Sequence, residues 1–128
     1  MKKILLALTL VFAVSSSAFA ASSETESNNT FETANSLAVD SSITGQVDKI
    51  DDEDIFVFVA NKTGQVRVLL TAPTGVAAVG LYDSDTSYIR NAILDMPMDI
   101  EVVAGQKYYL KVLRLGETVN YSLSVNNL

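Results

Sequence analysis

The residues with the clearest chemical potential form a short acidic run, Asp51, Asp52, Glu53 and Asp54. Like charges this close repel one another unless they are solvated or bound to a cation. Ca²⁺ takes roughly six to eight oxygen ligands, which carboxylates and Asn carbonyl groups supply. In an extended chain, Asp52 and Asp54 point to the same side. The run is therefore either part of a Ca²⁺ site or a solvated acidic turn, and no EF-hand pattern is present to decide between them.

Two reactive residue types are missing from the whole chain, because it contains neither His nor Cys. Their absence excludes His-assisted Ser or Cys nucleophiles and the usual zinc ligands. Two carboxylates could still act as acid and base if an apolar pocket raised one pKa. Most acidic residues here lie in polar turns, so the sequence predicts that the protein is not an enzyme.

The N-terminus has the pattern of a signal peptide. Lys2 and Lys3 precede an apolar stretch over residues 4–14, and Ala18-Phe19-Ala20 places small residues at a cleavage site. The apolar stretch is too short for a membrane span of about 20 residues. We expect residues 1–20 to be removed, leaving a periplasmic or secreted protein with no membrane anchor.

The size and charge of the remaining chain limit its class and its partners. Of 128 residues, 108 remain after cleavage, which fits a single domain. Loss of Lys2 and Lys3 moves the net charge from −6 to −8, with 15 acidic residues against seven basic ones. A phosphate backbone would be repelled by this charge, so nucleic acid is excluded as a partner.

The elements that must position these residues are predicted to be β-strands. Residues 21–35 are polar, without an apolar period, and Thr30–Asn35 has the length of a single helical turn. Residues 36–128 contain about eight short apolar or alternating segments separated by turn residues, which is typical of a β-sandwich or barrel. These candidate strands are residues 43–47, 54–60, 65–72, 76–82, 88–94, 98–103, 107–113 and 119–125.

Three segments together resemble a known family. Glu24–Asn35 is similar to the E-x-E-x-N-[DN]-[ST]-x-x-x-A-N opening of bacterial pre-peptidase C-terminal (PPC) domains. Gly45 followed by Asp52–Phe58 resembles the glycine and D-x-D-x-[FYW]-x-F strand entry of that family. Ala104–Val112 and Asn120–Val125 resemble its A-G-x-Y-Y-[LV]-x-V and Y-x-L-x-V ending.

This resemblance implies a fold and a metal site. The fold is an all-β, jelly-roll-like antiparallel β-sandwich, found as an accessory domain behind secreted peptidases. Related collagen-binding modules of bacterial collagenases bind Ca²⁺ through an N-terminal segment and an acidic loop. By analogy the oxygen ligands here would be Glu24, Glu26, Asn28, Asn29, Asp52 and Asp54, with Asp51 as a substitute. The family usually trails a catalytic domain, whereas here the signal peptide leads directly into the module, so we expect a free-standing domain.

Aromatic and cationic residues on the later strands are candidates for ligand binding. Tyr and Arg are enriched at binding hot spots, although strand aromatics more commonly pack on or between sheets. Tyr108 and Tyr121 are interpreted as packing residues. For Tyr88, Arg90 and Tyr109 the sequence leaves both interpretations open.

Two functional hypotheses follow from these observations. The first is an exported, non-catalytic, Ca²⁺-stabilised module that recognises an extracellular or envelope protein or a polysaccharide. The second is a periplasmic partner of a secreted enzyme, such as an inhibitor, immunity protein or chaperone. The second rests on the expected free-standing form. Relatives carry the domain in the same chain as a secreted enzyme, whereas a free-standing domain would bind such an enzyme as a separate protein.

Overall fold

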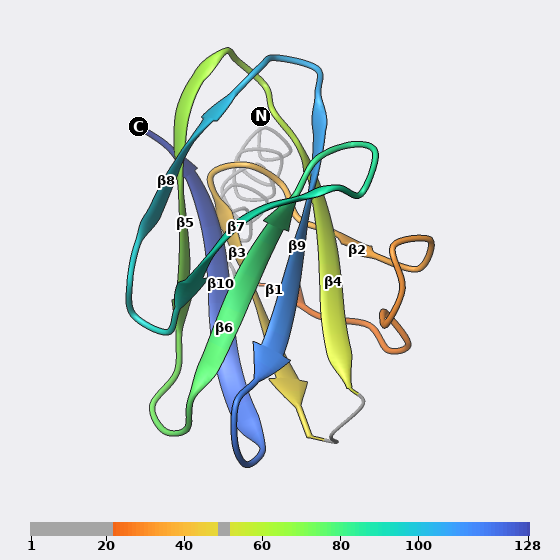
Figure 1. The fold of residues 1–128 in the computed structure, drawn as a ribbon, viewed down its shortest axis with the longest axis vertical. Helices are drawn as coiled ribbons and strands as arrows, with labels where there is room; N and C mark the ends of the chain where they lie inside the picture. Colours follow the sequence, from red (N-terminus) through yellow and green to blue (C-terminus); the bar gives the residue numbers. More distant parts are fainter. Residues whose placement is uncertain (1–21, 49–51) are drawn as a thin grey trace, which may run out of the picture.

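Two five-stranded β-sheets pack face to face in the computed structural model of the protein, which describes residues 22–48 and 52–128 (Figure 1). Sheet A contains, in spatial order, β1 (Ser22–Ser23), β3 (Ser41–Val47), β10 (Val119–Asn127), β5 (Gly64–Thr71) and β8 (Met98–Val102). Sheet B contains β2 (Asn35–Ser36), β4 (Glu53–Val59), β9 (Lys107–Arg114), β6 (Ala77–Tyr82) and β7 (Tyr88–Ile93). The expected all-β sandwich is confirmed, and no membrane-spanning helix occurs among the described residues.

The eight longer strands form where the sequence alternates or is continuously apolar. Along β10 the buried side chains Val119, Tyr121, Leu123 and Val125 alternate with polar ones, so one face of the strand meets the core. In β4 the inward residues Phe56 and Phe58 are fully buried against the other sheet. All eight begin and end within two residues of the predicted bounds.

Two short strands were not predicted. β1 pairs with β3 and β2 pairs with β4, each over two residues and each in a parallel orientation. The sandwich therefore has ten strands in its described part and is not wholly antiparallel. At Thr30–Asn35, where one helical turn was expected, consecutive bonds from Thr33 N to Thr30 O and from Ala34 N to Phe31 O form a turn, and β2 begins at Asn35.

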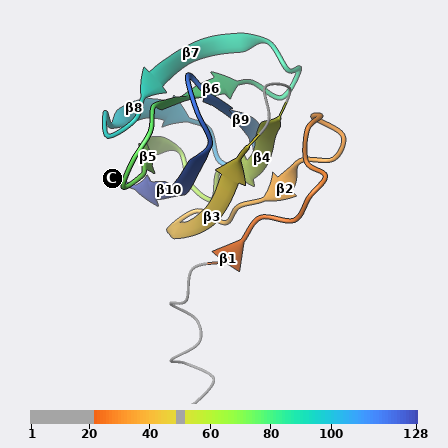
Figure 2. The ribbon, with the colours of Figure 1, turned by 90° about the horizontal axis from the view of Figure 1, so that it is seen from below.

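The segment between these two short strands, residues 24–34, bridges the two sheets. β1 extends sheet A beyond β3, and β2 extends sheet B beyond β4, so the chain crosses from one sheet to the other along this side of the sandwich (Figure 2). The residues predicted to bind a metal lie on this crossing and at the start of β4.

Candidate metal centre and aromatic surface

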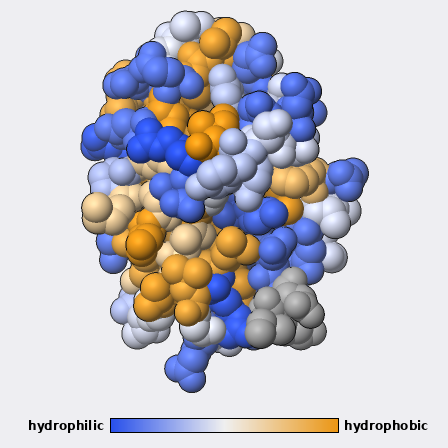
Figure 3. Space-filling view, in the orientation of Figure 1, coloured by the Kyte–Doolittle hydropathy of each residue, from blue (hydrophilic) through white to orange (hydrophobic). Residues whose placement is uncertain are grey.

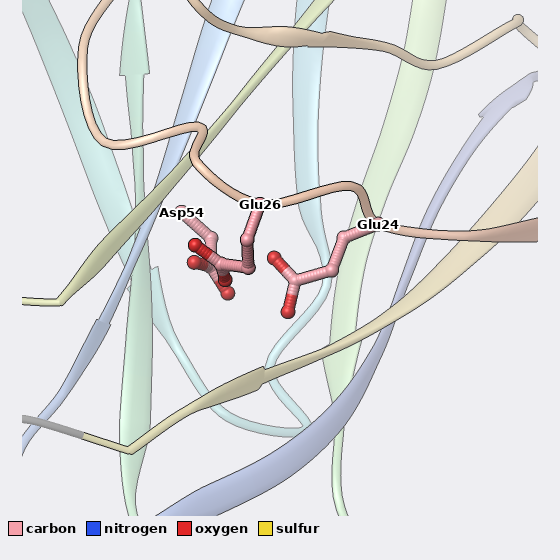
Figure 4. Close-up of side chains that lie close together, drawn as sticks. All are labelled: Glu24, Glu26 and Asp54. Carbon is pink, nitrogen blue, oxygen red and sulfur yellow. The ribbon is translucent and has the colours of Figure 1, made fainter.

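Three carboxylates converge where residues 24–34 pass the start of β4. Figure 4 shows Glu24 and Glu26 pointing from this segment toward Asp54 on β4. One oxygen from each lies within 4.8 Å of the others. Residues far apart in the sequence are thus brought to one point by the two short strands that hold the segment against both sheets.

The backbone of β3 fixes Glu24. Its amide donates to Thr44 O (2.8 Å), and its Oε2 accepts a hydrogen bond from Gln46 N (2.6 Å). Between these two residues lies Gly45, where an added Cβ would stand 2.8 Å from Glu24 Cδ and would also collide with the Tyr121 hydroxyl. A glycine is therefore required here for space, because the Glu24 and Tyr121 side chains both lie over its backbone.

Asp54 is fully buried, and only one of its two carboxylate oxygens has a hydrogen-bond partner among the described residues. Its Oδ2 accepts a hydrogen bond from the Tyr121 hydroxyl (2.5 Å). Its Oδ1 has no hydrogen-bond partner among the described residues. A buried acceptor without a partner costs about 1–3 kcal/mol, and a bound cation could supply the partner that the described residues do not.

Asn28 repeats this arrangement. Its side chain is fully buried, and its Nδ2 donates to Glu24 Oε1 (3.1 Å) and to Asn35 Oδ1 (3.2 Å). Its own Oδ1 has no partner within the described part of the chain. The backbone oxygen of Asn28 accepts from Ile55 N (2.9 Å), which holds this residue against β4. Two buried oxygens therefore lack partners among the described residues, one on Asp54 within the carboxylate cluster and one on Asn28 beside it.

The crowding of acids changes their protonation. Burial, followed by the charge of Glu24, raises the pKa of Asp54 from 3.8 to about 8, against the opposing effect of the Tyr121 hydrogen bond. Loss of solvation, with the charges of Glu24 and Asp52, raises the pKa of Glu26 to about 7. Both shifts have the same cause: several carboxylates meet here without a positive charge among the described residues around them, which disfavours their ionised forms.

Asp52 and Asn29 lie at the rim of the cluster. Asp52 accepts from Asp48 N (3.2 Å), and burial raises its pKa. With its amide oriented to satisfy both ends, Asn29 donates to Asp52 Oδ1 (3.3 Å) and to Glu53 O (3.1 Å). A cavity of about 480 Å³ opens beside them, lined by Glu24, Glu26, Ser27, Asn29, Gln46, Asp48 and Asp52.

The sequence-based site is thus partly assembled and partly revised. Of the candidate ligands, Glu24, Glu26 and Asp54 meet, Asn28 contacts Glu24, and Asn29 and Asp52 stand beside them, as described above. Asp51 lies outside the described residues. Asp54 lies in β4, in agreement with the strand predicted over residues 54–60, and its side chain is fully buried on the inner face of that strand.

Two residues of the site, Gln46 and Tyr121, were not predicted as site residues, and Gly45 was named only as part of the family motif. Tyr121 packs in the core as predicted, yet its hydroxyl also holds Asp54. The signal was present in the alternation of β10, because a tyrosine facing inward needs a hydrogen-bond partner in the core.

The site has the chemistry of a cation site more than that of an acid–base pair. Raised pKa values are what a catalytic acid requires. Here, however, a third carboxylate joins the pair, so three carboxylate oxygens converge. The buried Asn28 amide lies beside them and donates from Nδ2 to Glu24 Oε1. Hard oxygen ligands of this kind suit Ca²⁺.

A second feature, the aromatic surface, covers the outer face of sheet B. It consists of Phe31, Tyr82, Tyr88 and Tyr109. The Phe31 ring meets Tyr82 and Tyr109 edge-on, at 5.3 and 5.1 Å between centroids, and Tyr88 meets Tyr82 at 5.7 Å. Lys111 Nζ lies 5.1 Å from the Tyr82 ring centroid and 5.3 Å from that of Phe31, within cation–π range.

The three candidate ligand-binding residues do not all share this surface. Tyr88 and Tyr109 belong to it, joined through Tyr82 and Phe31. Arg90 instead donates from Nη1 to Asp99 O on β8 (3.1 Å), which links the two sheets at their edge. Phe31 was not predicted to take part, because it lies in the polar N-terminal segment, 51 residues before Tyr82.

The fold and the acidic cluster define a small β-sandwich module with an all-oxygen site between its N-terminal segment and its first long sheet-B strand. No protein-family profile matches the chain. Collagenase ColT of Clostridium tetani (strain Massachusetts / E88) is 32% identical over 111 residues, which cover 80% of this chain and 11% of that protein.

A solved structure of a collagenase domain has a similar fold. The crystal structure of the pre-peptidase C-terminal domain of a collagenase from Bacillus anthracis superposes with a TM-score of 0.59 at 21% identity, covering 72% of this chain and 93% of that one. The expected resemblance to pre-peptidase C-terminal domains is thereby confirmed at the level of the fold.

Proposed function

We propose that the protein is an exported, non-catalytic binding module whose fold is stabilised by Ca²⁺ at the carboxylate cluster. The observation that carries the metal is a pair of buried oxygens without partners among the described residues, Asp54 Oδ1 and Asn28 Oδ1. Asp54 is one of three carboxylates that each place an oxygen within 4.8 Å of the others. Glu24, Glu26, Asp54 and Asn28 would hold the ion. Asp52, Asn29 and Asp51 complete the proposed ligand set from the acidic loop and the segment end.

The role of the ion would be structural. It would neutralise carboxylates that otherwise repel one another, and so would fix residues 24–34 against both sheets. A ligand that binds only the folded state stabilises it, by about 2.7 kcal/mol at a concentration one hundred times its Kd. Metal binding should therefore appear as thermal stabilisation of the whole domain.

Calorimetric titration of Ca²⁺ into the EDTA-treated protein, with thermal melts alongside, tests this role. We expect saturable binding and a raised melting temperature for the wild type. Asp54→Asn, which keeps the shape but removes the charge, should abolish both effects. Asp85→Asn changes an exposed carboxylate of the β6–β7 turn and should abolish neither. No heat and no shift with wild-type protein would refute the metal site.

The ligand of the module would be an extracellular protein. The related proteins are collagenases by name, so collagen is the first candidate. We place its binding on the aromatic surface, because Tyr side chains and cations such as Lys111 offer large, partly rigid contact areas typical of hot spots. Of the candidate ligand-binding residues, Tyr88 and Tyr109 belong to this surface.

Surface plasmon resonance on immobilised collagen tests the ligand, with envelope polysaccharides as a second panel. Tyr109→Ala should weaken collagen binding at least tenfold. Leu115→Ala, which truncates an exposed apolar side chain in the β9–β10 turn, is the matched control and should leave it unchanged. Binding to a polysaccharide alone would replace collagen as the ligand, and equal loss in both variants would move the binding site away from the aromatic surface.

Export rests on residues 1–20, which lie outside the described residues. N-terminal sequencing of the protein recovered outside the cytoplasm should begin at Ala21. A chain that begins at Met1 and stays in the cytoplasm would contradict the proposed compartment.

A further inference from the structure

The outer edge of sheet B is formed by β7, and this edge is unusually open. Natural sheets protect their edges with short strands, charged side chains, proline or covering segments. β1 and β2 end their sheets with two residues each, and β8 turns the charged residues Asp99 and Glu101 outward. β7 is six residues long and contains no Lys and no Pro.

The side chains along this edge are apolar and exposed. The exposed fractions are 56% for Tyr88, 46% for Ile89, 55% for Ile93 and 61% for Met96 in the turn that follows. The single charge on the strand, Arg90, donates to Asp99 O. Figure 3 shows apolar residues gathered on this side, over β6 and the end of β7.

The backbone groups that face outward can be assigned from the register. Leu94 N donates to Ala77 O (3.0 Å), and the pairing continues with Ile93 opposite Ala78 and Asn91 opposite Gly80. Antiparallel pairs alternate between hydrogen-bonded and non-hydrogen-bonded, so the N–H groups of Asn91 and Ile93 point away from β6. The edge therefore offers backbone donors beside apolar side chains, which is what an added strand requires.

The charges at the two ends of β7 indicate what kind of strand would pair there. Asp83 and Asp85 lie in the turn before the strand, and Asp95 follows it directly. A second copy paired about a twofold axis would be antiparallel, because a twofold interface is self-complementary. It would set Asp95 of one copy near Asp85 of the other, and like charges disfavour this arrangement.

We propose that the β7 edge is a docking site for an extended apolar segment of a partner protein that carries basic residues at both ends. The segment adds a strand to sheet B through the Asn91 and Ile93 backbone, and its basic ends face the acidic turns on either side. This inference is independent of the proposed metal site, because it does not use the carboxylate cluster. It shares Tyr88 with the aromatic surface but does not use Tyr109.

Fluorescence anisotropy with labelled synthetic peptides tests this site on the full protein. The probe is the peptide KKVTVTVKK. The peptide EEVTVTVEE tests the charge argument, and KKVTPTVKK keeps the charge but cannot form a regular strand. We expect saturable binding of the first peptide, and binding at least tenfold weaker for the other two. Equal binding of KKVTVTVKK and KKVTPTVKK would reduce the effect to general charge attraction and overturn the proposal, as would no binding at all.

Variants locate the site on β7. Asn91→Pro removes an N–H that the fold itself does not use, and should weaken the peptide at least tenfold. Ile93→Lys places a charge on the strand edge, which should hinder the addition of another strand. It is the second test variant if thermal melts show that Asn91→Pro does not fold. Val103→Lys, at a side chain 53% exposed in the β8–β9 turn, is the control and should bind normally. Asp54→Asn should also bind normally, which separates this result from failure of the metal site.

Sedimentation velocity tests whether a second copy of the protein occupies the β7 edge. The wild-type protein should remain monomeric without a peptide. Self-association that Asn91→Pro abolishes would show that a second copy occupies the edge, and would overturn the charge argument.

Discussion

At the scale of single residues, the contact between Tyr121 and Asp54 determines how the acidic cluster behaves. The Tyr121 hydroxyl donates to Asp54 Oδ2 (2.5 Å) and lowers the pKa of a carboxyl that burial raises. Asp54 and Tyr121 are separated by 67 positions in the sequence. The predicted ligand set named Asp54 from its motif, but no local pattern connects it with a tyrosine on the last strand.

Tyr121→Phe removes this hydroxyl and nothing else. We expect the metal-free protein to lose about 1–3 kcal/mol of unfolding free energy, because a buried oxygen loses its partner. The pKa of Asp54 should rise further, and Ca²⁺ affinity should fall. Urea unfolding and carboxyl-carbon NMR titration would measure these effects.

Tyr109→Phe is the matched control for that change. Its hydroxyl makes no hydrogen bond with the described residues, so neither stability nor the titration of Asp54 should change. Equal losses in the two variants would mean that the Tyr121 hydroxyl has no special role.

At the scale of elements, the eight long strands could be predicted because each carries its own signal of alternation or β-branched composition. β1 and β2 could not be predicted, since two residues contain no period and both pair in parallel with distant strands. The candidate ligands Glu24, Glu26 and Asn28 lie between these two strands. Their placement therefore came from a family resemblance and not from the pattern of the sequence.

The approach of β1 and β10 to β3 depends on Gly45, which stands opposite Tyr121 in the β3–β10 register. Gly45→Ala would push the new Cβ into the Glu24 carboxyl and the Tyr121 ring. We expect a loss of about 1–3 kcal/mol, typical of overpacking, together with weaker Ca²⁺ binding. Gly116→Ala, where a Cβ would meet nothing within 4 Å, should change neither.

Thermal melts with and without Ca²⁺ would separate the two consequences of Gly45→Ala. A variant that melts like the wild type and still responds to Ca²⁺ would show that the segment carrying Glu24 tolerates displacement from β3.

At the scale of the whole molecule, the absence of His gives the carboxylate cluster an unusual influence on stability. Apart from the α-amino group, ordinary side chains of this composition do not titrate between about pH 5 and 8. The pKa values of about 8 for Asp54 and about 7 for Glu26 place the cluster in this empty window. The cluster titrates as a coupled set, so its effect belongs to the group.

The direction of the resulting pH dependence is fixed by linkage. The pKa values in the folded state lie above the ordinary 3.8 and 4.5, so between them the folded protein binds more protons than the unfolded chain. The stabilising contribution is complete below about pH 4 and is lost as the pH rises through 7 and 8. In EDTA we therefore expect the unfolding free energy to fall between pH 5 and 8, by an amount on the order of a few kcal/mol.

Saturating Ca²⁺ should remove this fall, because an ion at the cluster favours the charged carboxylates that high pH produces. Asp54→Asn should make the fall in EDTA smaller, because Glu26 alone then titrates with a raised pKa, whereas Asp85→Asn should leave it unchanged. Urea unfolding at four pH values, with and without Ca²⁺, would measure all three profiles. Stability that rises with pH in EDTA would mean that the cluster is already charged and solvated in the metal-free protein, so relief of charge repulsion could not be the reason that an ion binds there.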